Sequence, residues 1–202
     1  MTKDEETIEY KGYTVHIKRD TNCEDGPRDW DNMGTMICFH RRYKLGDEHE
    51  MTPEGFDEWL AKNKDDVIIL PLYLYDHSGI TISTVPFNDH WDSGKVGHIY
   101  MTKAKAREEF GWKVVTKRRR DKILDCLRGE VEAYDQYLRG EVYGYIIEGK
   151  EKENVDSCWG YYGKDGVMQD AKNSVDNLLK QVGSERSKTR KMVEMQVEMQ
   201  MT

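Results

Sequence analysis

The apolar run over residues 67–75 (VIILPLYLY) most strongly constrains how this chain can fold. Its β-branched and aromatic side chains favour a strand, and Pro71, which has no amide hydrogen to donate, indicates a bulge or a sheet edge within it. The run is far shorter than the ~18 apolar residues that a membrane span requires. A globular fold built on a sheet, with no membrane partner, is therefore expected.

Shorter patterns predict the other elements. Alternating residues 7–18 indicate a hairpin turning at Lys11-Gly12, and residues 19–34, rich in Asp, Asn, Gly and Pro, indicate a long loop. Further strands are predicted at residues 35–40, 80–85, 96–101, 141–148 and 157–162. Helices are predicted to start at Thr52-Pro53, at Thr102 and at Thr116, and to cover residues 167–182. We expect an α+β fold, with an antiparallel or mixed sheet and three to four helices packed mainly on one face.

One domain is expected over residues 1–183, followed by a tail over residues 184–202. Gly183 is predicted to end the last helix. The tail is at first polar and basic, and then repeats Val-Glu-Met-Gln from Val193 and again from Val197. We expect it to be mobile, as chain ends commonly are. The alternative is that the Met-rich repeat drives self-association into a homo-oligomer.

Neither the first residues nor the cysteines indicate secretion. Residues 1–6 (MTKDEE) are acidic and lack the apolar stretch of a signal peptide. The four cysteines are far apart and show no CxxC spacing, which disfavours a disulfide scaffold and a zinc ribbon. Reduced thiols in a cytoplasm are the expected state.

The acidic charge is concentrated in one segment. Residues 1–100 carry 20 Asp and Glu against 11 Lys and Arg, whereas residues 101–202 carry 18 against 20. Most of the excess lies between Lys44 and Asp66, with eight acidic and three basic side chains. Such a field repels nucleic acid and attracts basic proteins. We therefore expect no direct nucleic-acid binding, and a partner-binding surface made by Asp47, Glu48, Glu50, Glu54, Asp57 and Glu58.

One polar cluster could hold a metal ion. Asp29, Asp31 and His40 combine hard carboxylates with an imidazole, a mixture that several metals accept. Their spacing matches no known metal loop. The simpler interpretation is a loop whose Asp and Asn side chains cap backbone amides or pair with neighbouring arginines.

Cys38 and His40 alternate along a predicted strand and would face the same way. With His77 or Asp76 they could complete a zinc site, or they could act as a Cys–His nucleophilic pair. A core histidine beside a buried thiol is the simpler interpretation.

Residues 89–92 (DHWD) place an imidazole between two carboxylates, which would suit general acid–base work, although an ordinary turn explains the segment equally well. The sequence contains no GxxxxGK[ST], GxGxxG, HExxH or GxSxG motif, and no cofactor is expected. The alternative function is a metal-dependent hydrolase or nuclease acting on nucleotides or nucleic acid. It would use His40, Asp76, His77, Asp89, His90 and Asp92.

Two further segments stand out by composition. The basic run 117–120 (KRRR), with Lys122, opens a predicted helix, where the helix dipole disfavours cations. It could clasp phosphate, or form a solvated face paired with nearby acids. Residues 143–145 and 156–163 are rich in Trp and Tyr, and could form a partner-binding surface or fill a core.

Several segments together resemble a family of uncharacterised proteins encoded by bacteriophages and related mobile elements. They are residues 27–46 (PRDWDNMGTMICFHRRYKLG), 71–84 (PLYLYDHSGITIST), 86–101 (PFNDHWDSGKVGHIYM), 129–145 (GEVEAYDQYLRGEVYGY) and 156–163 (DSCWGYYG). The resemblance spans roughly residues 7–180 and carries no established reaction, so it transfers no functional residues. What it implies is the context of a viral protein in a host cytoplasm.

In that context, a small acidic protein without enzyme motifs is expected to bind and block a host protein. Host defence nucleases and CRISPR effectors hold nucleic acid in positively charged channels, which an acidic surface can occupy in place of phosphates. The leading hypothesis is therefore a non-enzymatic inhibitor of a host defence system, of anti-CRISPR or anti-restriction type, acting through an acidic, aromatic-rich surface. Its partner would be a host protein with a basic nucleic-acid-binding surface.

Overall fold

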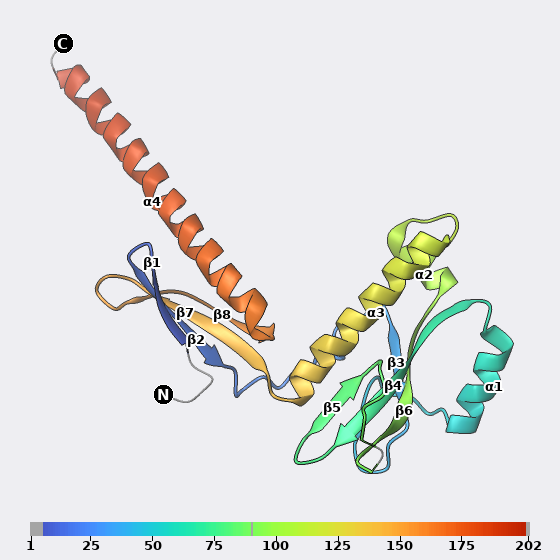
Figure 1. Cartoon of the computed structure of the whole chain (residues 1–202). Helices are drawn as coiled ribbons and strands as arrows, with labels where there is room; N and C mark the ends of the chain where they lie inside the picture. The colour runs from blue at the N-terminus through green and yellow to red at the C-terminus, as the bar shows by residue number, and fades with distance from the viewer. Residues whose placement is uncertain (1–5, 90, 201–202) are drawn as a thin grey trace. The chain divides into compact units, whose positions relative to one another are not determined.

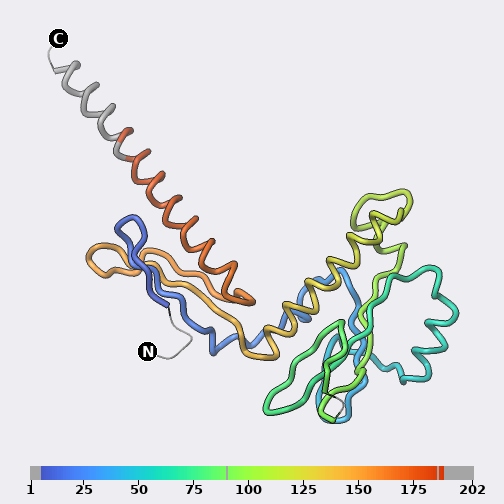
Figure 2. Tube along the Cα trace, in the orientation of Figure 1, coloured from blue at the N-terminus to red at the C-terminus, as the bar shows by residue number. Residues whose placement is uncertain are grey.

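The computed structural model of the chain describes residues 6–89 and 91–200, with the backbone alone at residue 186 and at residues 189–200. The predicted α+β class is confirmed, because the described chain contains two four-stranded antiparallel sheets and four helices. The chain divides into two compact units (Figures 1 and 2). Residues 22–141 form one unit, the central unit, and residues 1–21 with 142–202 form the other, the terminal unit.

The terminal unit is a sheet with one long helix against it. Its strands lie in the order β1-β2-β7-β8, and its helix is α4. The bounds are β1 Glu6–Tyr10, β2 Tyr13–Arg19, β7 Val142–Glu148, β8 Asn154–Tyr162 and α4 Lys164–Gln200. The predicted hairpin is confirmed, since Tyr10 pairs with Tyr13 and the two turn residues, Lys11 and Gly12, both have positive φ. Such turns match the right-handed twist of paired strands.

Alternation along the strands places the core of the terminal unit on the side that α4 covers. Apolar residues of β2 and β7 meet a stripe on α4 at four-residue spacing. The buried set is Val15, Ile17, Tyr143, Tyr145, Ile147, Val167, Ala171 and Val175.

The prediction that this last helix ends at Gly183 is wrong. α4 continues to Gln200, because one glycine lowers helix stability without forbidding the conformation, and the residues after it are good helix formers. The predicted mobility of residues 184–202 and the predicted single domain over residues 1–183 stay predictions.

The central unit is built on the second sheet, of strand order β3-β6-β4-β5. Its elements are β3 Thr35–Cys38, α1 Pro53–Asn63, β4 Val67–Asp76, β5 Ile80–Ser83, β6 Ser93–Thr102, α2 Lys103–Phe110 and α3 Lys117–Leu138. The long helix α3 packs on one face of this sheet, where Ile123, Leu127 and Val131 join Ile99 and Leu72 in the core.

The strand that carries Pro71 is confirmed, and it lies inside the sheet between β6 and β5. Pro71 pairs with His98 of β6, and the register shifts just after it, between Leu72 and Tyr73. The strand β5 pairs only with residues 73–76. Pro71 therefore lies before the residues whose amides form hydrogen bonds with β5. Its missing amide hydrogen costs no hydrogen bond there, so an inner strand can accommodate the proline.

The predicted helix starts are confirmed. The hydroxyls of Thr52, Thr102 and Thr116 each accept a hydrogen bond from the amide three residues later. Gly111, in the left-handed conformation, ends α2. Within the described residues, no helix has both the length and the apolar character needed to cross a bilayer.

Candidate functional site

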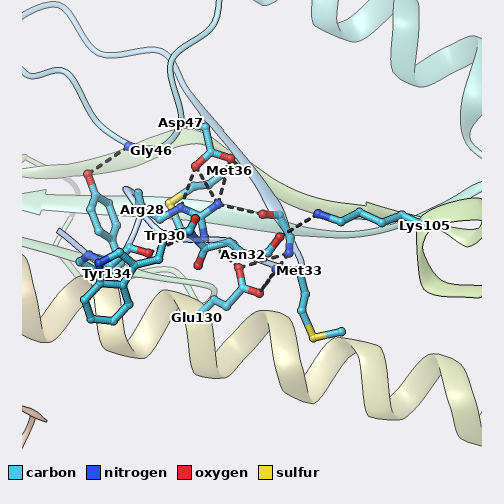
Figure 3. A network of polar contacts seen from close by, with 12 residues as sticks. Arg28, Trp30, Asn32, Met33, Met36, Gly46, Asp47, Lys105, Glu130 and Tyr134 are labelled. Carbon is cyan, nitrogen blue, oxygen red and sulfur yellow. Dashed lines mark hydrogen bonds and ion pairs between the residues drawn. The ribbon is translucent and has the colours of Figure 1, made fainter. Parts of the chain in front are cut away.

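A buried arginine organises the loop that opens the central unit (Figure 3). The side chain of Arg28 is 6% exposed, and it donates to the two carboxylate oxygens of Asp47 at 2.7 and 2.9 Å. It also donates to Glu130 of α3 and to the carbonyl of Gly34, both at 2.8 Å. A guanidinium fork suits this double recognition. Arg28 thus ties its loop to α3 and to the segment before α1.

The backbone completes this network. Glu130 accepts hydrogen bonds from the amides of Met33 and Gly34 at 2.9 and 3.0 Å, and Asp47 accepts one from Met36 at 2.9 Å. The sequence predicted Asp47 as a partner-binding carboxylate. In the structure it shares the single cation of Arg28 with Glu130, so its charge is partly compensated, unlike that of an unpaired surface carboxylate.

The other five predicted carboxylates are exposed, and we term them the acidic face: Glu48, Glu50, Glu54, Asp57 and Glu58. Three of them lie on α1 at positions i, i+3 and i+4, which places them on one side of the helix. Among the described residues, none of the five forms an ion pair with a lysine or arginine. Their charge is therefore free to act on a partner.

Aromatic packing fixes the opposite side of α1. Phe56 is 1% exposed and stacks on His98 with ring centroids 5.2 Å apart, and Trp59 lies 4.8 Å from Tyr100. His98 and Tyr100 alternate along β6 with core residues that face α3, so α1 contacts the sheet face opposite α3. The helical part of the acidic face thus sits on a helix that is held by the buried ring of Phe56 and the half-buried ring of Trp59.

The histidine beneath α1 carries no compensating charge at neutral pH. Burial lowers the pKa of His98 to about 4, and the cation of Lys95 acts in the same direction. Asp57 acts weakly in the opposite direction. A neutral ring at this position leaves the negative potential of the acidic face undiminished.

A second feature is a cleft of about 240 Å³ on the central unit. Its walls come from three segments that are distant in sequence, within residues 39–42, 74–76 and 91–96. The cleft gathers three of the residues predicted for the hydrolase alternative, namely His40, Asp76 and Asp92. The fold therefore brings together three side chains that the sequence had predicted one by one, with no sign that they lie close in space.

Polar contacts hold these side chains in place. Nδ1 of His77 lies 2.9 Å from a carboxylate oxygen of Asp92. Asp76 pairs with Arg42 and accepts the Tyr43 hydroxyl at 3.3 Å. His77 does not line the cleft itself, but its partner Asp92 does. A histidine oriented by a carboxylate in this way can accept a proton from water.

His40 occupies its own position in the cleft. Its Nδ1 accepts hydrogen bonds from the amides of Arg42 and Tyr43 at 3.3 and 3.2 Å, and its ring stacks on Tyr43. Since Nδ1 accepts, the neutral ring carries its proton on Nε2. His40 can thus donate through Nε2 but cannot serve as a base through Nδ1.

Asp89 contacts the backbone of two residues that closely follow it. One carboxylate oxygen of Asp89 accepts hydrogen bonds from the amides of Trp91 and Asp92 at 2.8 and 3.0 Å, an Asx-type arrangement. Asp89 thus caps the backbone, and its acid–base role stays a prediction. His90 lies outside the described residues.

Among the side chains that the structure describes, no group of three or more His, Cys, Asp or Glu is placed to hold a metal ion. Asp29 instead caps the amide of Gly26 at 2.7 Å, and Asn32 donates to two carbonyls of the same loop. The capping interpretation of this loop is confirmed, whereas Asp31 is simply exposed.

The Cys38–His40 pairing does not form as predicted. The strand β3 ends at Cys38, so the alternation that would align the two side chains stops there. Cys38 lies in the core beneath α3, and burial raises the pKa of its thiol to about 12. A protonated core thiol is a poor nucleophile and a poor zinc ligand.

The aromatic segments of the terminal unit serve two purposes. Tyr143 and Tyr145 are buried beneath α4. Trp159 is 45% exposed, and its ring packs over Gly144 on the opposite face of the sheet. Of the two alternatives, the core thus holds for Tyr143 and Tyr145, while the Trp159 ring is available at the surface.

Sequence reasoning missed three residues of the cleft, namely Arg42, Lys95 and Trp91, and it did not single out Glu130 of the buried network. The doublet Arg41-Arg42 beside His40 was a visible signal for the first. Nothing in the sequence indicated that Trp91 would be 96% exposed at the cleft.

Comparisons of the chain with protein-family models, with curated proteins and with solved structures found no match. The function is therefore argued from the chain's own residues.

Proposed function

We propose that this chain is a non-enzymatic binding protein whose acidic face occupies a basic, nucleic-acid-binding surface of a partner protein. In the context implied by the resemblance to phage-encoded proteins, the partner belongs to a host defence system of CRISPR or restriction type. The observation that carries the proposal is the helix α1, which presents Glu54, Asp57 and Glu58 from one side without ion-pair partners among the described residues.

The energetics favour a partner of opposite charge. Exposed like charges repel one another, so unpaired carboxylates on adjacent turns slightly destabilise α1. The aromatic contacts of Phe56 and Trp59 hold the helix in place despite this. A basic partner would remove the repulsion and add attraction, which chiefly raises the association rate and the specificity.

Pre-organisation supports the same interpretation. A carboxylate array on a packed helix loses little conformational freedom when it binds, apart from the side chains themselves. Nucleic-acid channels present rows of Lys and Arg that normally meet phosphates, and a fixed row of carboxylates competes for the same cations.

The test is affinity capture from a bacterial host lysate, with elution in rising salt. We expect one dominant basic partner, released by salt and displaced by a short DNA duplex that competes for its basic surface. The triple variant Glu54→Lys, Asp57→Lys, Glu58→Lys should weaken capture on the order of 100-fold, since it replaces attraction by repulsion.

The matched control reverses three exposed carboxylates elsewhere, Glu132, Glu151 and Asp170. It changes the net charge equally, and its capture should stay close to that of the wild type. If both triple variants weaken capture to the same extent, net charge rather than the acidic face is responsible. If neither does, the acidic face is not the binding surface.

The second candidate function is metal-independent hydrolysis beside the cleft, favoured by the 2.9 Å contact between His77 and the cleft residue Asp92. Asp92 would orient the ring, His77 would take a proton from water, and the cations of Arg42 and Lys95 would attract an anionic substrate.

A screen of phosphodiesters and nucleotides tests this candidate in the presence of a chelator. Turnover that survives the chelator, falls at least about 100-fold in His77→Ala and persists in His16→Ala would support it, given the usual size of general-base effects. Turnover that is equal in both variants would place the chemistry elsewhere.

A further inference from the structure

The corner formed by α2, the start of α3 and the residues between them is strongly basic. Residues 103–122 contain nine Lys and Arg against three Asp and Glu, a local net charge of +6 in a chain of net charge −7. Six of the nine cations are exposed: Arg107, Lys113, Lys117, Arg118, Arg120 and Lys122. We term these six the basic corner.

The basic corner is not neutralised within the described part of the chain. None of its six cations forms an ion pair there. The remaining lysines of the segment are engaged, because Lys103 and Lys105 donate to the carbonyls of Asp65 and Asn32. The sequence left open whether the basic run pairs with neighbouring acids, and the structure shows that it does not.

The start of α3 adds to the positive potential. The first turn of α3 contains no acidic residue, although helices commonly place acids there to offset the helix dipole. Consecutive cations at residues 117–120 instead repel both the dipole and one another. An anion bound at this corner would relieve that unfavourable charge.

Two stacked rings support the corner. Phe110 and Trp112 lie nearly parallel, with centroids 4.3 Å apart. Arg119 lies 5.0 Å from the centroid of Trp112, and Lys122 lies 5.8 Å from that of Phe110. A gap of 4.3 Å between rings has no room for a cation, so each cation covers the outer face of its ring.

This covering indicates which part of a nucleic acid the corner would contact. Single-strand binders use exposed aromatic faces on which bases stack. Here the faces of Phe110 and Trp112 are taken by each other and by Arg119 and Lys122, and none is left for a base. Exposed cations without free rings favour the phosphate backbone of a duplex.

We infer that the basic corner binds the phosphodiester backbone of double-stranded nucleic acid, without sequence preference. The overall negative charge led the sequence to predict no direct nucleic-acid binding. The structure segregates the charges, with the acidic face on α1 and the cations on α2 and α3, so the net charge does not describe either surface. The inference rests on the corner alone and is independent of the proposed function.

The test is fluorescence anisotropy with two labelled 20-base-pair DNA duplexes of unrelated sequence and a labelled single strand. Non-specific sites made by phosphate contacts typically have Kd values of about 10⁻⁴ to 10⁻⁶ M at physiological salt. We expect the wild type to fall in this range, with both duplexes bound equally within about threefold. The plot of log K against log salt should have a slope of roughly −3 or steeper.

The triple variant Lys113→Gln, Lys117→Gln, Arg118→Gln removes three cations whose side chains form no hydrogen bond, ion pair or ring contact within the described residues, so the fold should persist. It should weaken duplex binding at least tenfold and reduce the salt slope by roughly 2.7, since each phosphate contact contributes about 0.9. The control Lys44→Gln, Lys62→Gln, Lys64→Gln removes three exposed cations near the acidic face and should change neither quantity.

Four results would overturn the inference. One is no duplex binding by the wild type at about 50 mM salt, where such contacts are strongest. Another is a salt slope near zero for the wild type. This result would exclude phosphate contacts without any use of the variant, and so holds even if the variant misfolds. A third is much tighter binding of the single strand. The fourth is self-association of the wild type in sedimentation velocity, lost in the triple variant, which would assign the corner to a second copy of this chain.

Discussion

The amide of Asp20 donates a 2.8 Å hydrogen bond to the carbonyl of Val142, although the whole central unit lies between these residues in sequence. The bond continues the ladder of β2 and β7, in which Arg19 pairs with Tyr143. The chain therefore leaves the terminal sheet and returns to it at neighbouring positions. Residues 22–141 form an insertion between two adjacent points of another fold.

This topology predicts that residues 22–141 fold when expressed alone. The segment contains its own sheet, three helices and a separate apolar core, and domains with closely spaced ends tolerate excision. Urea unfolding followed by circular dichroism should show one cooperative transition. A gradual loss of signal without a transition would contradict this and would favour the single domain that the sequence predicted.

The network around Arg28 predicts a large loss of stability on truncation. Arg28→Met leaves the carboxylates of Asp47 and Glu130 without their shared cation, and breaking a buried pair commonly costs about 3–5 kcal/mol. Urea denaturation measures the free energy of unfolding. The exposed pair of Arg128 and Asp125 is the matched control, and Arg128→Ala should cost only about 0–1 kcal/mol.

If Arg28→Met and Arg128→Ala lower the free energy of unfolding equally, the network is not buried in solution. The triple variant Arg28→Met, Asp47→Asn, Glu130→Gln removes the uncompensated charges as well. It should recover part of the loss, since the cost of the single substitution lies largely in the charges left behind.

Substitution of two glycines of β6 by alanine should have opposite effects on the free energy of unfolding. A Cβ at Gly97 would lie 2.0 Å from the carbonyl oxygen of Ile37 and 2.8 Å from Cα of Cys38, both backbone atoms of the paired strand β3. A Cβ at Gly94 would meet no atom within 4 Å. Gly97→Ala should therefore lower the free energy of unfolding by about 3 kcal/mol or more, because the strand pairing must shift.

Gly94→Ala should instead be neutral or slightly stabilising, since alanine loses less backbone entropy on folding. Thermal unfolding of the two variants side by side gives the comparison. A similar midpoint for both would mean that β3 and β6 adapt more easily than the register implies.

Local sequence patterns predicted most of the elements because their causes are local. Threonine caps set three helix starts, and the positive φ of Lys11 and Gly12 sets one hairpin. The end of α4 was missed at Gly183, because a glycine only biases a helix end and good helix formers follow it.

The site was predicted less well, since its geometry is tertiary. Charge counting found the exposed carboxylates of α1, but it could not distinguish Asp47, which pairs with the distant Arg28. Likewise, no local pattern connects His77 with Asp92 or Arg42 with Asp76, because strand pairing in the sheet creates both contacts.

The contact between Phe56 and His98 makes a prediction about acid. Burial lowers the pKa of His98 to about 4, below its ordinary value of about 6.5. Between these values the unfolded chain binds a proton that the folded chain does not, so the free energy of unfolding falls as the pH falls. The contribution of neutral His98 is complete above about pH 6.5 and is progressively lost toward pH 4.

The variant His98→Phe keeps an aromatic ring against Phe56 and cannot take up a proton. Between pH 7.5 and 4.5 the wild type should lose on the order of 1–2 kcal/mol more than the variant, after allowance for the partial exposure of His98. Other titrating groups are common to both proteins and cancel in the difference. Urea denaturation at the two pH values measures it. Equal losses would show that His98 takes up its proton without disturbing the packing of α1.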